Sequence, residues 1–133
     1  MANSIEVKVD LVNDKAEQVH LGKELPFETI DPRGGSQVVT YGDYRVAITH
    51  SVDPWKSEKG DRDGHYNHRM IVWDKDWNLA KISKKFSFLN TNIEFCCGMT
   101  YFDNHFLITA GIQDNAAILL KVPGDALREF VYE

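Results

Sequence analysis

Two nine-residue stretches decide the fold of this chain: Tyr41-Gly42-Asp43-Tyr44-Arg45-Val46-Ala47-Ile48-Thr49 and Tyr101-Phe102-Asp103-Asn104-His105-Phe106-Leu107-Ile108-Thr109. Tyr, Asp, Ile and Thr recur at an offset of 60 residues, and several other positions match in character. Each stretch places a turn-forming pair between two apolar runs, which is typical of a β-hairpin. The repeat predicts two similar antiparallel units, and chance similarity between two hairpins is the alternative.

Strand patterns continue outward from the two hairpins. Apolar residues alternate with charged ones over residues 5–12, which predicts an N-terminal strand with one apolar face. Pro and Gly residues mark 25–35 and 53–64 as loops. Only residues 125–132 show helical spacing, after Pro123 and Gly124. The remaining predicted strands are Gln37–Tyr41, Tyr44–Val52, Tyr66–Trp73, Leu79–Phe88, Phe95–Phe102, His105–Ile112 and Ala116–Val122.

The predicted organisation is one domain, residues 1–133, made of two blade-like units. The first unit spans residues 33–92 and the second spans 93–133, where strand 5–12 is the candidate for a missing fourth strand. The predicted fold class is all-β, with antiparallel four-stranded blades, a partial β-propeller-like arrangement and a short C-terminal helix. A blade buries both faces of its sheet against its neighbours, so an isolated pair of blades would leave two apolar faces exposed. Three arrangements avoid this: several copies close a ring, the chain is part of a longer protein, or the fold is a sandwich.

The composition argues against two classes of partner, nucleic acids and membranes. The formal net charge is −5 without a Lys/Arg cluster, which argues against nucleic-acid binding. No apolar run approaches the length of about 20 residues that spans a bilayer, so no membrane partner is expected. Cys96 and Cys97 are adjacent and the start lacks a secretory h-region, so we expect a reducing, cytoplasmic location. No ligand spacing indicates a metal, and no cofactor is expected.

Several short motifs occur together in order. They are Arg33-Gly34-Gly35-Ser36, His50, Tyr66-Asn67-His68-Arg69, Asp74 to Leu79, Ile93-Glu94-Phe95-Cys96-Cys97-Gly98-Met99, Phe106-Leu107-Ile108-Thr109-Ala110-Gly111 and Asp114. Over residues 33–122 the chain resembles the C-terminal blades of family 130-type glycoside hydrolases and phosphorylases, and the related propellers that accompany glycosyltransferases. The resemblance implies a five-bladed propeller, a sugar site at one channel mouth and mannoside or related chemistry.

Two departures from that family bear on catalysis. The earlier blades, which carry the general-acid Asp, have no counterpart here. The His-Gly pair of the enzymes is His50-Ser51 in this chain. Glycosidic cleavage needs a proton donor beside the leaving oxygen and usually a second carboxylate or a phosphate nucleophile. Whether the chain is an enzyme therefore stays open; a glycoside hydrolase or phosphorylase is the type expected if it is one.

Six residues are candidates for binding a saccharide, a glycoside or phosphate: His50, Trp55, Tyr66, His68, Arg69 and Asp114. Trp55 is expected in a polar loop, where its ring could stack on a sugar. Arg69 offers a fork for carboxylate or phosphate, and a salt bridge between blades is the alternative. His50 could contact a sugar hydroxyl or be structural, and Asp114 could reach the ligand or cap an Asx turn.

Two functions remain in view. The first is a carbohydrate-related propeller module that binds glycans or contributes part of a glycosidase or phosphorylase site. The second is a non-enzymatic interaction or structural module that acts through oligomerisation, and a homo-oligomer is expected.

Glu94 could be a catalytic carboxylate or a loop charge before Phe95.

Overall fold

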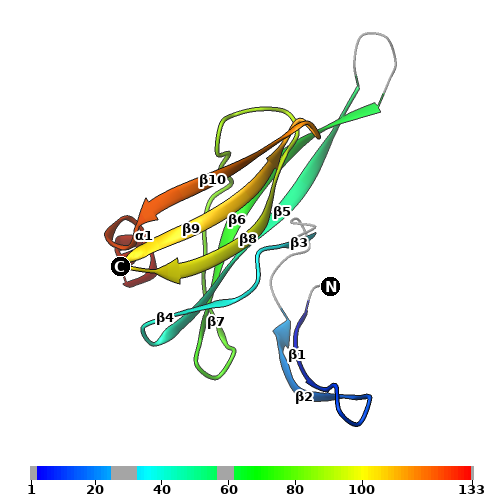
Figure 1. Cartoon of the computed structure of the whole chain (residues 1–133), viewed down its shortest axis with the longest axis vertical. Coiled ribbons are helices and arrows are strands. Elements are labelled where there is room, and N and C mark those ends of the chain that lie inside the picture. The colour runs from blue at the N-terminus through cyan, green and yellow to red at the C-terminus, as the bar shows by residue number, and fades with distance from the viewer. Residues whose placement is uncertain (1–2, 25–32, 57–61, 133) are drawn as a thin grey trace.

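The computed structural model describes residues 3–24, 33–56 and 62–132 of the chain. Strands dominate these ranges, every strand pairing is antiparallel, and a short helix follows the last strand (Figure 1). This confirms the predicted all-β class with its short C-terminal helix.

The first unit forms the larger sheet. It contains β3 (Arg33–Gly35), β4 (Val39–Tyr41), β5 (Tyr44–Lys56), β6 (Arg62–Asp74) and β7 (Leu79–Ile82). Their order is β3-β5-β6-β7, and β4 also pairs with β5. The long hairpin β5–β6 is the centre of this sheet, and the shorter strands extend it on both sides.

The second unit forms a three-stranded sheet in the order β10-β9-β8. It contains β8 (Glu94–Phe102), β9 (His105–Ile112) and β10 (Ala116–Pro123), and α1 (Gly124–Tyr132) follows directly. The predicted turns at Gly42-Asp43 and Asp103-Asn104 both connect paired strands, so the repeated hairpins form as expected.

The N-terminal strand has a different partner from the one considered above. β1 (Asn3–Asp10) pairs with β2 (Lys15–Glu24) in a separate hairpin, and the three-stranded sheet contains only β8, β9 and β10. The apolar alternation of residues 5–12 therefore forms a strand, but the strand does not complete the second unit.

The two larger sheets pack face to face around one core. Val46, Ile48, Met70 and Val72 from the first sheet are buried against the following residues of the second: Cys96, Met99, Phe106 and Ile108. Val46 and Phe106 are equivalent in the repeat, as are Ile48 and Ile108, so equivalent residues share one core. A further pair, Tyr41 and Tyr101, makes an edge-to-face contact with ring centroids 5.2 Å apart.

Strand lengths differ from the prediction at two places. Residues 53–56 and 62–64 were expected in a loop, yet Asp53 to Lys56 pair with His65 to Arg62 and extend the hairpin β5–β6. Ladder pairing across the hairpin overrides the local turn preference of Pro54 and Gly64. Beyond Ile82 the predicted strand is interrupted, and it returns only as a bridge between Phe86 and His68.

Candidate functional site

Three aromatic rings meet at the end of the molecule where β5 leaves the core. His50 of β5 and Tyr66 of β6 are stacked, with ring centroids 5.9 Å apart. Phe95 of β8 lies beside both rings, at 6.5 Å from His50 and 6.4 Å from Tyr66. The structure therefore brings together two predicted site residues, and Phe95 joins them from the second sheet.

Phe95 also lines an open depression of about 460 Å³ on the second sheet. Gly111 of β9 is the residue opposite Phe95, and a Cβ added there would lie 2.9 Å from the Phe95 Cζ atom. A side chain at position 111 would require the Phe95 ring to shift. The lining residues are Phe95, Gly111, Asp114, Asn115, Ala116 and Ala117.

Asp114 is held at the rim of this depression by the β9–β10 turn. Gln113 and Asp114 both have positive φ, 54° and 52°, and the Asn115 N–H donates to the Ile112 carbonyl at 3.1 Å. Asp tolerates this left-handed conformation better than most residues. Asp114 and Asn115 therefore line the same depression as Phe95, and both residues are exposed.

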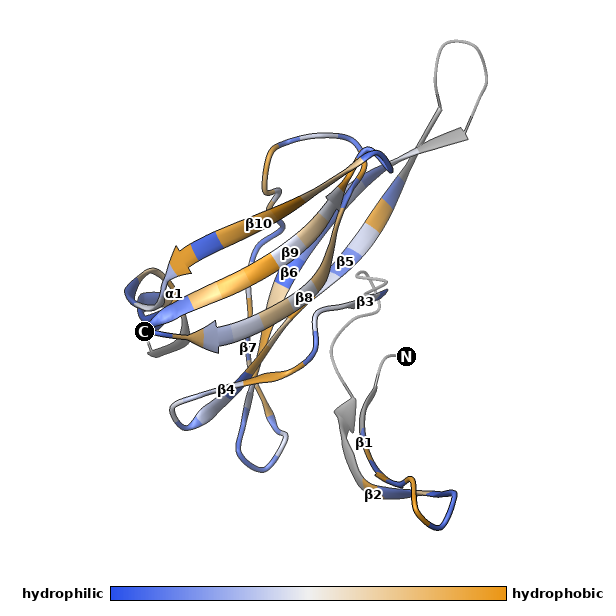
Figure 2. Cartoon of the chain, in the orientation of Figure 1, coloured by the Kyte–Doolittle hydropathy of each residue, from blue (hydrophilic) through white to orange (hydrophobic). Residues whose placement is uncertain are grey.

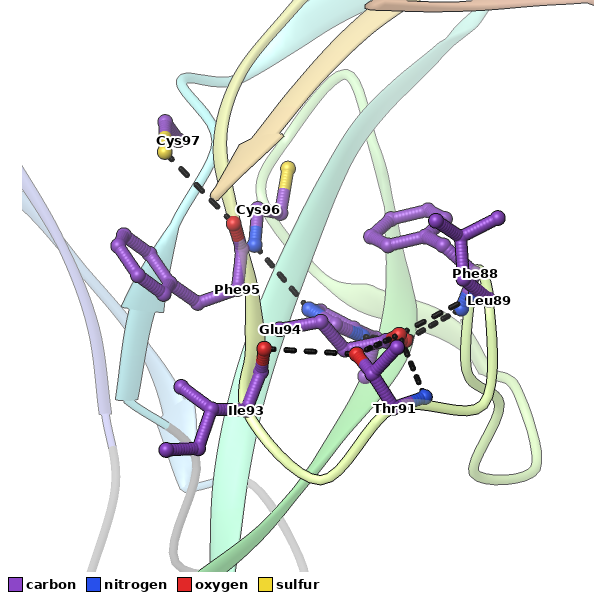
Figure 3. Close-up of polar contacts among 9 residues, drawn as sticks. Phe88, Leu89, Thr91, Ile93, Glu94, Phe95, Cys96 and Cys97 are labelled. Carbon is purple, nitrogen blue, oxygen red and sulfur yellow. Dashed lines mark hydrogen bonds and ion pairs between the residues drawn. The ribbon is translucent and has the colours of Figure 1, made fainter. Parts of the chain in front are cut away.

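Below the three rings, His68 is fully buried and cannot contact a ligand. The Cys96 N–H donates to His68 Nε2 at 3.1 Å, so this nitrogen carries no proton (Figure 3). His68 Nδ1 lies 3.8 Å from Glu94 Oε1, too far for a hydrogen bond. The rings of Phe88 and Phe86 pack against the imidazole, with centroids at 4.5 and 5.8 Å.

Glu94 organises the loop that leads into β8. Its carboxylate accepts hydrogen bonds from the N–H groups of Phe88, Leu89 and Thr91 and from the Thr91 hydroxyl (Figure 3). Burial raises the pKa of Glu94, but these four donors outweigh it and hold the pKa below its usual value. Glu94 is therefore a buried, ionised, structural carboxylate, which favours the structural alternative over the catalytic one.

Burial controls the protonation of His68. Desolvation lowers the pKa of His68 below its ordinary value, and the charge of His50 acts in the same direction. The Glu94 carboxylate opposes this shift but does not cancel it. A neutral imidazole agrees with the hydrogen bond that Nε2 accepts from Cys96. Through the hydrogen bond from the Cys96 N–H, His68 contacts β8 at the residue next to Phe95.

The remaining predicted residues lie elsewhere. Arg69 lies on the opposite face of β6 from His68, because side chains alternate along a strand, and it donates to the Ser83 carbonyl at 3.0 Å. The backbone of Trp55 belongs to β5, and its side chain lies outside the described part of the structure. Trp73 is buried, and Trp77 packs edge-on against it with ring centroids 5.9 Å apart.

A second cavity, of about 770 Å³, lies at the opposite end of the two sheets. The turns β4–β5 and β8–β9 and the start of α1 converge there (Figure 1). The Tyr41 hydroxyl donates to the Gly124 carbonyl at 3.1 Å, so this ring also anchors the helix. The lining residues are Tyr41, Gly42, Tyr101, Asn104, His105, Pro123, Gly124, Asp125 and Arg128.

Sequence reasoning missed two residues of the candidate site, Phe95 and Asn115. Phe95 belongs to a quoted motif and to a predicted strand but is not among the six candidates, and the Gly111 opposite it is a usable signal, because a glycine within a strand often permits a close approach. Asn115 is likewise not among the six candidates.

Comparison of the chain with protein-family models, with curated proteins and with solved structures gave no match. Within the described ranges, no group of three His, Cys, Asp or Glu side chains is placed to hold a metal ion. The helix of these ranges is too short to cross a membrane.

Proposed function

We propose that the chain is a carbohydrate-binding module and that the saccharide binds in the depression beside Phe95. The observation that carries the proposal is the placement of one aromatic ring next to a carboxylate and an amide, Asp114 and Asn115. Sugar rings offer an apolar C–H face and a rim of hydroxyls, so this combination suits them. The rings of His50 and Tyr66 lie beside Phe95, with centroids 6.5 and 6.4 Å from it.

The lining of the depression favours binding over cleavage. Among its described residues, Asp114 is the one carboxyl group, whereas glycoside hydrolysis uses a pair of carboxyl groups. The same lining includes no Lys, Arg or His, the residues that would hold a phosphate. Mannosides are the first ligands to test, because the sequence resembles family 130-type glycoside hydrolases and phosphorylases.

A calorimetric titration with methyl mannoside, methyl glucoside and methyl galactoside tests the proposal. We expect at least one glycoside to bind, and Asp114→Asn to weaken it about 10-fold, since a hydrogen bond to a charged group is worth roughly 1.5–3 kcal/mol. Asn preserves the left-handed turn, so the change removes only the charge.

The matched control is Asp103→Asn, which alters another exposed Asp in a turn with positive φ, at the opposite end of the sheets. This variant should bind as the wild type does. Equal weakening by both substitutions, or no binding of any glycoside by the wild type, would contradict the proposal. Gly111→Ala should also weaken binding, because the new methyl group displaces the Phe95 ring.

A further inference from the structure

The N-terminal hairpin carries an exposed apolar face. Val7 and Val9 lie on the same face of β1 and are 48% and 59% exposed. Their cross-strand partners on β2 are Gln18 and Ala16, both exposed. A two-stranded hairpin by itself is marginally stable in water. This face therefore gains stability if another apolar surface covers it.

The three-stranded sheet offers such a surface. Its residues alternate between the buried core and an outer face, and the outer face carries Leu107, Phe102 and Leu119. Phe102 is 69% and Leu119 67% exposed, although both are large apolar side chains. Among the described strands, β10 is an edge strand of this sheet, and Figure 2 shows hydrophobic and hydrophilic residues along it.

We propose that the hairpin β1–β2 of one copy docks on the outer face of the sheet β8–β10 of a second copy, and that the exchange is reciprocal. Within one chain the hairpin lies on the β3 side of the molecule, away from β10 (Figure 1). Reciprocal exchange joins each apolar face to another and gives a closed, two-fold symmetric dimer.

The buried area favours exchange between two copies. Two paired strands of eight residues cover about 26 Å by 10 Å, so one docking event buries roughly 500 Å² on the two surfaces together. Two reciprocal events bury roughly 1,000 Å², which reaches the lower limit of specific interfaces.

Light scattering on a size-exclusion column, at several protein concentrations, tests the exchange with the full chain. The wild type should have the mass of a dimer. Leu119→Lys on the accepting face and Val9→Lys on the arm should each give monomers. The matched control is Leu89→Lys, which changes a leucine that is 53% exposed outside both surfaces and should leave the dimer intact.

Each other outcome overturns the exchange. A wild type that stays monomeric at all concentrations shows that copies do not exchange arms. A dimer that survives Val9→Lys but not Leu119→Lys shows that the outer faces pair with each other without the arm. Circular dichroism of each variant, which should match that of the wild type, separates loss of the dimer from loss of folding.

Discussion

At the scale of single residues, hydrogen bonds account for the burial of two polar side chains near the aromatic cluster, Glu94 and His68. Glu94 can be buried and ionised because four donors surround its carboxylate. His68 can be buried because it is neutral and accepts the Cys96 N–H. The His68 arrangement could not be predicted from the sequence, since its partner Cys96 lies on another strand 28 residues away. Strand alternation by itself predicts that Tyr66 and His68 share one face of their strand.

His68 should make the stability of the protein depend on pH. Its pKa is lowered in the folded state, so its contribution is complete above the ordinary pKa of 6.5 and is lost as the pH falls below that value. Between about pH 7.5 and about pH 5.5 the free energy of unfolding should fall by about 1 kcal/mol through this group. Denaturant titrations of wild type and His68→Gln, whose amide oxygen can still accept from Cys96, measure the difference. Identical pH dependence in both proteins would contradict the assignment.

Glu94→Gln should destabilise the fold by about 2 kcal/mol, because an amide turns one acceptor into a donor that faces the N–H groups of the loop. Urea unfolding near neutral pH measures the change. Glu129→Gln on the exposed surface of α1 is the control and should differ from wild type by less than about 0.5 kcal/mol. Equal stability of the Glu94 variant would mean that the carboxylate does not hold this loop.

At the scale of elements, the tight turns were predictable and the long ladders were not. Gly42-Asp43 and Asp103-Asn104 contain the residue types that tolerate positive φ, and both form turns. Asp53 to Lys56 carry a proline and polar residues, so local preference indicated a loop, whereas pairing with β6 makes them a strand. Local residue preferences do not predict which distant strand a segment pairs with.

Gly42 tests the turn chemistry directly. Its φ of 58° is in the left-handed region, so Gly42→Ala should lower the free energy of unfolding by about 1 kcal/mol. Gly34→Ala is the matched control, because a Cβ there meets nothing within 4 Å and its φ is not in that region. Thermal unfolding of both variants checks this, and equal melting temperatures for the two would contradict it.

At the scale of the whole molecule, the repeat places equivalent residues in contact across one core. Tyr41 meets Tyr101, and Val46 and Phe106 belong to the same buried cluster. The repeat predicted two similar units, but it could not predict which of their faces would meet. The packing of these two faces also places Phe95 between the His50–Tyr66 pair and the Asp114 turn, which together form the proposed site.

The central claim is that a saccharide binds beside Phe95, and amide chemical-shift mapping by NMR tests it most directly. A saturating methyl glycoside should shift the amide signals of Phe95, Gly111, Asp114 and Asn115. The signals of Tyr101 and Asn104, in the cavity at the other end, should stay in place. Shifts confined to that other cavity, or no shifts with any of the three glycosides, would contradict the claim.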